Sequence, residues 1–482
     1  MSNTNDTIYI DIPGQTVSEL DPNNSNSNSD SDKDKDSYNQ NNNSNNNCDG
    51  NVATHRKRTS NSLSTSGDTC SASNVLDINN NGLSESNTLS DPIGAVEGGE
   101  ATQKLYEKLL RSPEQVKVTN IELFFDLVFV YAISAISETM VEDLTWEVVL
   151  EMLIVTLAVW WSWIFSAWTF NYLNPDSYEV RIFLMGSMLI SLVMSAVIPE
   201  SYTDKSLVFA GMYVLIQLGR SFWATFVLRG HGLMWTYLRL SIWHTGTAVM
   251  WLVGGAIGGT TRNVLWTVAI VIEYLSVTIG NYVPERCSLF IIIALGESIV
   301  VTGEAFREVL HQPAGVSMFI ISFFGAAAMW WIYFHTASSE ATEYVEHSND
   351  PGKIGRSAYT YIHVIMVIGI IWSAVADRIS IDLPYMVPHR EQGKMIYVAM
   401  TIGGPALFVF GHALFRRTFR PRFSIPHLIT VVVLICATPI GIFLPLWATA
   451  VTTTSILMLL AFYEAYFSCA ILPAQVAFMA EP

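Results

Sequence analysis

Long apolar runs separated by short polar breaks dominate the chain from Ile121 onward. The runs are roughly 17–25 residues long, which is the length that an α-helix needs to cross the hydrocarbon core of a bilayer. The breaks contain Pro, Gly, Asn and Asp, which favour turns, and the ten-residue alternation typical of a transmembrane barrel does not recur. The runs begin near Ile121, Glu147, Val180, Ser206, Leu233, Asn263, Ser288, Ala314, Ala358, Gly393, Pro426 and Ala448. The pattern therefore predicts an all-α, polytopic transmembrane helix bundle of about 12 spans.

The first 115 residues have a different character, with long stretches of Asn, Ser and Asp. Such a segment holds too few apolar side chains to offset the conformational entropy lost on folding, so we expect 1–115 to be a disordered tail. No apolar segment that could form a cleavable signal peptide follows Met1, and we therefore expect the tail to stay in the cytosol.

Composition and charge agree with a membrane protein. Of the 482 residues 50% are hydrophobic and only 14% are charged, which is too little polar surface for a soluble protein of this size. The net charge of −16 comes largely from residues 1–100, which hold 15 Asp and Glu against 5 Lys and Arg. The even-numbered loops carry more Lys and Arg than the odd-numbered loops, which predicts that both termini lie in the cytosol, without indicating which membrane holds the protein.

Several sequence features recur in the same order in the two halves of the predicted bundle. A Trp pair occurs in the second span, at Trp160–Trp161, and again in the eighth, at Trp330–Trp331. In the same way Asp126 corresponds to Glu297, the segment around Arg220 to that around His412, and Glu273 to Glu464. We therefore predict an internal duplication, with a first six-span repeat at 116–285 and a second at 286–482.

The charged residues inside the apolar runs are the candidate functional residues. At 1.5 Å per residue, Asp126 lies roughly 8 Å from the cytosolic end of its span, and Arg220, Glu273, Glu297 and Glu464 roughly 12–14 Å, so we expect these five residues to share one charged layer. Each such charge costs about 2.5–3.5 kcal/mol on insertion scales, so we expect these side chains to face the bundle interior. Arg220 needs a carboxylate partner, for which Asp126, Glu273 and Glu297 are the candidates. The predicted transport path or buried polar network consists of Asp126, Arg220, Glu273, Glu297, Glu464 and His412.

Other conspicuous residues favour structural roles. Glu122 is expected at the cytosolic interface, within reach of Arg111 and Lys117, and Glu285 and Arg286 at a loop mouth. The histidines His244, His335, His363 and His412 show no metal-ligand spacing, and the five cysteines show no CxxC pattern, so neither a metal nor a cofactor is expected. No nucleophile, phosphate-binding or dinucleotide motif occurs, which argues against an enzyme, and no basic stripe supports nucleic-acid binding.

Several segments together resemble the bacterial low temperature requirement A (LtrA) family. They are "ELFFDLVFVYAIS", "QLGRSF", "ERCSLFIIIALGESIV", "WWIYFHTASSEA" and "DPGKIGRSAYTYIHVIMVIGI", and the likeness covers most of residues 116–470. The resemblance implies a polytopic membrane protein of a family named for growth in the cold, with no settled activity. Bacterial relatives often have Asp after "WWIYF", where this chain has His335. A weaker similarity, of architecture alone, is to lysosomal potassium channels with two six-span repeats and a Phe-Ser-Asp motif on the first helix. Here "FFD" at Phe124–Asp126 has Phe in the middle position, and the second half has Glu297 in place of the motif.

Two hypotheses for function follow from these observations. In the first, the protein moves an ion or small solute along the buried charged residues. In the second, it is a non-transporting membrane scaffold or cold-adaptation factor, whose buried charges only fix helix packing. The expected partners are the lipid bilayer, an ion or small solute and a second copy of the chain, whereas nucleic acid is not expected.

Overall fold

The computed structural model describes residues 108–111, 118–276, 287–337, 340–341, 344, 355–390, 395–420 and 422–479. The predicted disordered tail lies almost entirely outside these ranges, as do Glu285 and Arg286. The described part is helical apart from turns and an isolated backbone bridge between Leu110 and Leu173. The predicted all-α fold is therefore confirmed for the described residues.

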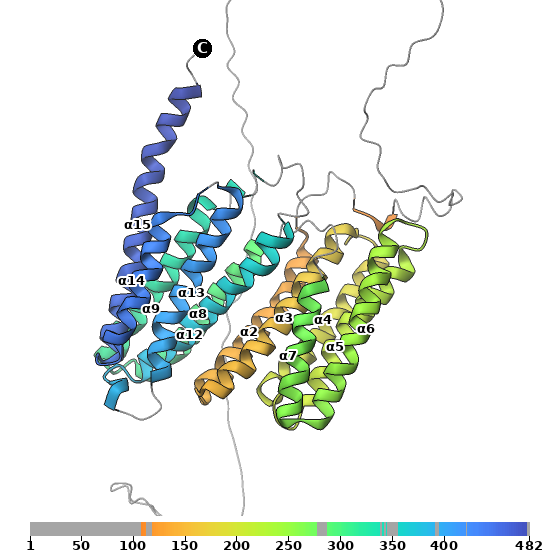
Figure 1. Ribbon diagram of the computed structural model, residues 1–482, viewed down its shortest axis with the longest axis horizontal. Helices are drawn as coiled ribbons and strands as arrows, with labels where there is room; N and C mark the ends of the chain where they lie inside the picture. The colour runs from red at the N-terminus through yellow and green to blue at the C-terminus, as the bar shows by residue number, and fades with distance from the viewer. Residues whose placement is uncertain are drawn as a thin grey trace, which may run out of the picture. The chain divides into compact units, whose positions relative to one another are not determined.

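Twelve long helices lie alongside one another in this part of the chain (Figure 1). They are α2 (Asn120–Glu142), α3 (Trp146–Tyr172), α4 (Tyr178–Ala196), α5 (Ser206–Val227), α6 (Leu233–Ile257), α7 (Gly259–Ser276), α8 (Cys287–Val309), α9 (Pro313–Ile332), α12 (His363–Asp382), α13 (Met395–Phe419), α14 (Ile425–Gly441) and α15 (Leu446–Met479). Short 3₁₀ segments, η1 (Ile198–Glu200) and η5 (Pro388–Arg390), and π-helical segments, η3 (Tyr333–Ala337) and η4 (Gly355–Ile362), complete the order. Each long helix begins within a few residues of an apolar run named above, apart from α12, whose run starts in η4.

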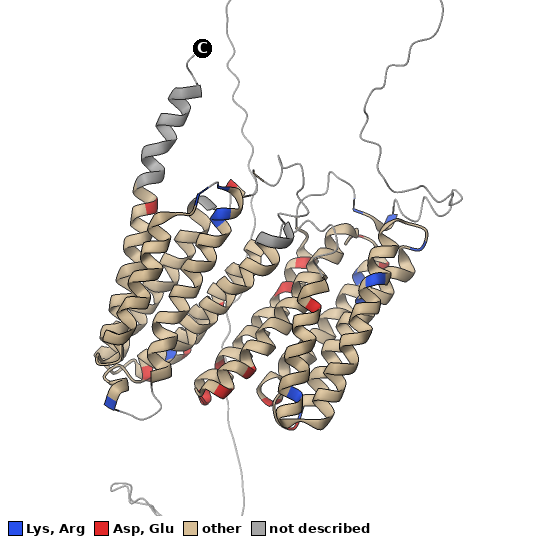
Figure 2. Ribbon diagram, viewed as in Figure 1, with Lys and Arg blue, Asp and Glu red and all other residues tan. Residues whose placement is uncertain are grey.

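The helices have the length and composition of membrane spans. Ten helical segments of the described chain are long and apolar enough to cross a bilayer, α14 is apolar but has 17 residues, and α7 is not among the ten. Lys, Arg, Asp and Glu are sparse along the helices and gather mostly near their ends (Figure 2). The chain is thus built for a bilayer, with a few charged exceptions inside.

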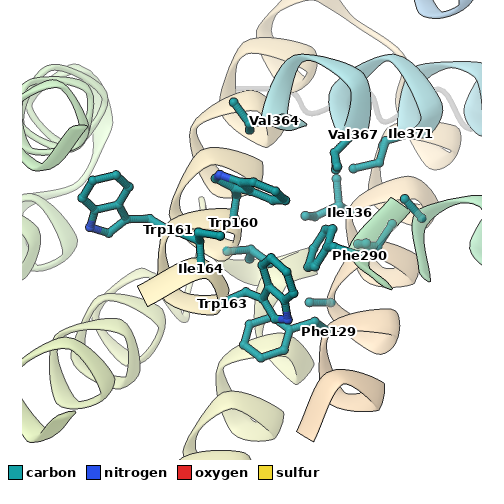
Figure 3. Packing of buried hydrophobic residues seen from close by; sticks show 14 of the residues in the cluster. Phe129, Ile136, Trp160, Trp161, Trp163, Ile164, Phe290, Val364, Val367 and Ile371 are labelled. Atoms are coloured by element: carbon teal, nitrogen blue, oxygen red, sulfur yellow. The ribbon is translucent and has the colours of Figure 1, made fainter. Parts of the chain in front are cut away.

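Several of the largest fully buried side chains are aromatic residues of α3. Trp160 and Trp163 both lie against Phe290 of α8, with ring centroids 5.0 and 4.5 Å away, and Ile136 and Val367 flank them (Figure 3). Trp160 and Trp161 are almost completely buried, whereas Trp330 and Trp331 remain 48% and 39% exposed. The two Trp pairs therefore have different environments, and the internal duplication stays a prediction.

A hydrogen-bonded seam joins the first helices of the chain to the π-helical segment η4. The Trp160 indole N–H donates to the backbone carbonyl of Thr360 at 3.0 Å. The Tyr361 hydroxyl donates to the backbone carbonyl of Tyr274 in α7 at 2.6 Å, and the Tyr274 hydroxyl donates to that of Leu157 in α3 at 3.1 Å. In an apolar environment such backbone acceptors need partners, and the side chains of this seam supply the donors.

Helices α12 and α13 cross at two glycines. A methyl group added to Gly369 would lie 2.6 Å from the backbone nitrogen of Phe408. One added to Gly404 would lie 2.7 Å from both the backbone nitrogen and the hydroxyl of Ser373. Small residues let membrane helices approach this closely, because backbone then packs directly on backbone. This crossing fixes the positions of Ser373, one turn after Gly369 in α12, and of Thr401, one turn before Gly404 in α13.

Candidate functional site

Glu122 belongs to the start of α2. Its Oε2 accepts hydrogen bonds from the backbone N–H and the hydroxyl of Thr119, each at 2.8 Å, and the bond from the backbone N–H is the glutamate half of a capping box. Its Oε1 accepts a hydrogen bond from Arg111 at 3.3 Å, so the predicted contact with Arg111 is confirmed. Lys117 lies outside the described residues. Glu122 is therefore a carboxylate that caps the N-terminal end of α2 and is 1% exposed.

Asp126 lies one turn deeper in α2 and points at α3. Its Oδ1 accepts a hydrogen bond from the indole N–H of Trp163 at 2.8 Å, and the residue is only 4% exposed. A carboxylate bonded to an indole in a tightly packed aromatic core is held in one orientation. Asp126 therefore joins α2 to α3.

Glu297 lies near the middle of α8, where that helix packs on α2. It is 1% exposed, and its Oε2 accepts a short hydrogen bond from the Ser134 hydroxyl of α2. Its Oε1 has no hydrogen-bond partner among the described residues. Glu138 lies one turn after Ser134 toward the C-terminal end of α2, and Glu304 lies two turns after Glu297 toward the C-terminal end of α8. Both interact electrostatically with Glu297 as like charges. Glu297 is thus a buried carboxylate that is only half satisfied and has acidic neighbours.

Glu273 and Arg220 belong to one hydrogen-bonded chain among α5, α6 and α7. The Tyr213 hydroxyl donates to Glu273 Oε2 at 2.5 Å, and the Trp251 indole donates to Oε1 at 3.1 Å. The amide of Gln217 donates to the Tyr213 hydroxyl at 2.9 Å, and its oxygen accepts a short hydrogen bond from Arg220. The structure therefore connects Arg220 to Glu273, one of its three predicted partners, through two intervening side chains.

The guanidinium of Arg220 is also anchored on α3. It donates to the Ser166 hydroxyl at 3.0 Å and to the Ser162 carbonyl at 3.2 Å, and it lies 5.3 Å from the centre of the Phe165 ring. These contacts, together with 2% exposure, place the cation inside the bundle as predicted.

Glu464 and His412 belong to a separate group, formed by the C-terminal part of α13, the start of α14 and the middle of α15. Arg416 forms a buried ion pair with Glu464 Oε1, and His427 Nε2 lies 3.5 Å from the same oxygen. His412 Nδ1 is 2.9 Å from His427 Nε2, and Ser424 Oγ is 2.7 Å from His427 Nδ1. Arg416 lies within α13, which continues to Phe419 and brings the guanidinium against α15.

The contacts of the described residues join the predicted side chains in four groups: Asp126 with Trp163, Glu297 with Ser134, Glu273 with Arg220, and Glu464 with His412. A single continuous charged layer stays a prediction. The histidines considered for metal binding lie in different places: His244 Nδ1 is 2.9 Å from Ser221, His363 Nε2 is 2.8 Å from the Tyr333 hydroxyl, and His335 stacks on Trp331.

A further carboxylate, Asp377 of α12, lies within an apolar run and was not predicted as a site residue. It lies in the run "IIWSAVADRISID" and borders a small pocket among α9, α12, α13 and α15. The signal was present, since an acid in an apolar run of this length is expensive and rare. It was missed because the adjacent Arg378 made the segment resemble a loop.

An interior built from long apolar helices, with a few hydrogen-bonded charges between them, defines an integral, multi-pass α-helical membrane protein. The chain belongs to the family described as bacterial low temperature requirement A protein (LtrA), whose pattern it matches over residues 117–462. The resemblance inferred from the sequence is thereby confirmed. An uncharacterized protein of Rhizobium meliloti (strain 1021) is 30% identical over 388 residues, which cover 76% of this chain and 94% of that relative. No solved structure matches the chain.

Proposed function

We propose that the protein moves an ion or small solute across its membrane, that the transported species is a cation, and that Glu297 lies on its path. The observation that carries this proposal is the unsatisfied Oε1 of Glu297 at the middle of α8. An unpaired carboxylate oxygen in a bilayer-spanning bundle is costly, so a fold that keeps one requires a compensating partner such as a cation, a proton or water.

The surroundings of Glu297 favour a cation over an anion. Glu138 and Glu304 interact with it as like charges, and both are exposed on the protein surface near the ends of α2 and α8. Glu308 and Asp382 lie at the same end of α8 and α12, where both bind Arg378. Acidic side chains at a path entrance raise the local concentration of cations and repel anions.

Flux measurements on reconstituted protein test the proposal. Liposomes containing the full chain are challenged with gradients of H⁺, Na⁺, K⁺ and chloride, and cation flux is expected. Glu297→Gln keeps the size of the side chain and removes its charge, so we expect it to reduce the flux strongly. Glu147→Gln, the same change at an exposed position in the first turn of α3, is the matched control and is expected to leave the flux unchanged.

Thermal unfolding in detergent separates a lost path from a lost fold. A Glu297→Gln variant that unfolds at the wild-type temperature and has lost flux supports the proposal. Absence of flux for every ion in correctly folded wild-type protein would refute it, as would a Glu297→Gln variant with wild-type flux.

The alternative is a non-transporting membrane scaffold or cold-adaptation factor. It is favoured by Glu273, whose two oxygens both accept hydrogen bonds. A carboxylate that is satisfied in this way fixes helix positions without binding anything further. Under this alternative, Glu297→Gln shifts the unfolding temperature and alters no conductance.

We also propose that both termini lie in the cytosol, that the protein associates with a second copy of itself, and that it is not an enzyme. A reporter that fluoresces only in the cytosol, fused in turn to each end of the chain, tests the orientation. A fusion at either end that does not fluoresce would overturn the proposed orientation.

A further inference from the structure

A small polar pocket lies where four helices of the second half of the chain meet. Its volume is about 20 Å³, which is enough to hold one water-sized particle. It is bordered by Gly325 and Met329 of α9, by Ser373, Ala376 and Asp377 of α12, by Thr401 and Pro405 of α13, and by Ala450, Thr453, Thr454 and Leu457 of α15. Polar side chains thus come from three of these helices, and the fourth, α9, adds the Ser322 hydroxyl as a hydrogen-bond partner of Asp377.

Three of the hydroxyl groups that border this pocket can act only as acceptors toward it. Ser373 donates its hydrogen to the carbonyl of Gly369 at 2.8 Å, Thr401 to that of Tyr397 at 2.8 Å, and Thr453 to that of Thr449 at 2.9 Å. A hydroxyl has one hydrogen to donate, so each of these oxygens keeps only lone pairs for other partners.

Pro405 adds a backbone acceptor. It lies inside α13 and has no N–H, so the carbonyl of Thr401, four residues earlier, loses its usual helical donor. Thr401 and Pro405 both border the pocket. Membrane proteins tolerate such a freed carbonyl where another group satisfies it.

The negative charge of Asp377 is not neutralised by its neighbour in the sequence. Arg378 directs its guanidinium away from the pocket, with Nε 3.0 Å from Asp382 and Nη2 3.2 Å from Glu308. Asp377 is the ionisable residue of the pocket lining. The pocket therefore combines one carboxylate with several oxygen acceptors and lacks a protein cation of its own among the described residues.

We propose that this pocket binds a single monovalent metal cation of about the size of Na⁺, held by the carboxylate of Asp377 with the hydroxyl and carbonyl oxygens around it. Hard cations prefer oxygen ligands, and a single carboxylate balances a single positive charge. The volume admits a bare ion and excludes organic ammonium ions. The site is distinct from Glu297 and does not depend on the proposed transport, because a resident ion could equally stabilise a protein that transports nothing.

The test measures the thermal unfolding of the full chain in detergent, in NaCl or in choline chloride at equal ionic strength. Na⁺ is expected to raise the unfolding temperature of the wild type, because a ligand that binds only the folded state stabilises it. Asp377→Asn is expected to abolish this rise. Asp382→Asn, the same substitution one turn further along α12 on a residue that binds Arg378, is the matched control and should keep it.

Pro405→Ala provides a variant that is not expected to harm folding. Alanine restores the N–H that can donate to Thr401, so the helix gains a hydrogen bond while the pocket loses an acceptor. We expect Pro405→Ala to be at least as stable as the wild type in choline, with binding of radioactive ²²Na⁺ weakened about tenfold, the loss typical of one contact to a charged group.

The outcomes separate clearly. Saturable ²²Na⁺ binding near one ion per chain that is lost in Asp377→Asn and weakened in Pro405→Ala supports the site. An unfolding temperature that is the same in Na⁺ and choline, or ²²Na⁺ binding that survives Asp377→Asn, overturns it. Neither readout involves flux, so a failure here leaves the proposal for Glu297 untouched.

Discussion

The crossing of α12 and α13 predicts that two adjacent glycines respond in opposite ways to the same substitution. At Gly404 an added methyl group would lie 2.7 Å from the nitrogen of Ser373 and 2.9 Å from the carbonyl oxygen of Gly369. At Gly403 the nearest heavy atom is a ring carbon of Trp372, 4.0 Å away, which is an ordinary contact. The two positions therefore differ in what the methyl group meets and not in the chemical change.

The expected magnitudes follow from these contacts. Backbone atoms cannot rotate out of the way, so Gly404→Ala must push the two helices apart by several tenths of an ångström. Overpacking of this kind typically costs about 1–3 kcal/mol, and contacts to backbone place Gly404→Ala in the upper part of that range. Gly403→Ala meets no obstacle and gains helix propensity, worth up to about 1 kcal/mol.

Thermal unfolding in detergent, followed by circular dichroism, measures the difference. Gly404→Ala is expected to unfold several degrees below the wild type and Gly403→Ala at or slightly above it. Because Ser373 touches Gly404 and borders the cation pocket, Gly404→Ala should also weaken ²²Na⁺ binding. Equal unfolding temperatures for the two variants would show that the helices do not cross at Gly404.

Two further matched pairs test the buried polar groups. Trp163→Phe removes the donor of Asp126 and should lower the free energy of unfolding by about 1–3 kcal/mol more than Trp161→Phe, since the equally buried Trp161 N–H has no partner among the described residues. Equal losses would refute the bond between α2 and α3. Arg416→Gln leaves Glu464 buried without its cation and should cost about 3–5 kcal/mol, whereas Arg417→Gln on the exposed side of the same helix should stay within about 0.5 kcal/mol. An Arg416→Gln variant as stable as Arg417→Gln would mean that Glu464 is satisfied in another way.

The helices could be predicted from the sequence because their cause is local. A run of about 20 apolar residues has no stable alternative to a helix in a bilayer, since each backbone polar group must be satisfied within its own segment. The starts at Ser206, Leu233 and Pro426 agree with the structure to within one residue for this reason.

The pairing of the charged residues could not be predicted in the same way, because it depends on which helix faces come together. Counting along a helix gave the depth of Arg220 but not the chain through Gln217 and Tyr213 that links it to Glu273. Hydropathy likewise could not assign Arg416 to a helix rather than a loop, because a long helix carries charges at its ends in either case.

The seam at η4 has a consequence for how sequence can drift in this family. Its acceptors at Thr360 and Tyr274 are main-chain carbonyls, which every residue type supplies, while its donors are the particular side chains Trp160 and Tyr361. Selection to keep the two parts of the chain joined therefore acts on the donor side alone. We therefore expect the side chain at Thr360 to vary across relatives as far as this link is concerned, whereas loss of the Trp160 indole removes the hydrogen bond between α3 and η4 whatever residue stands at position 360.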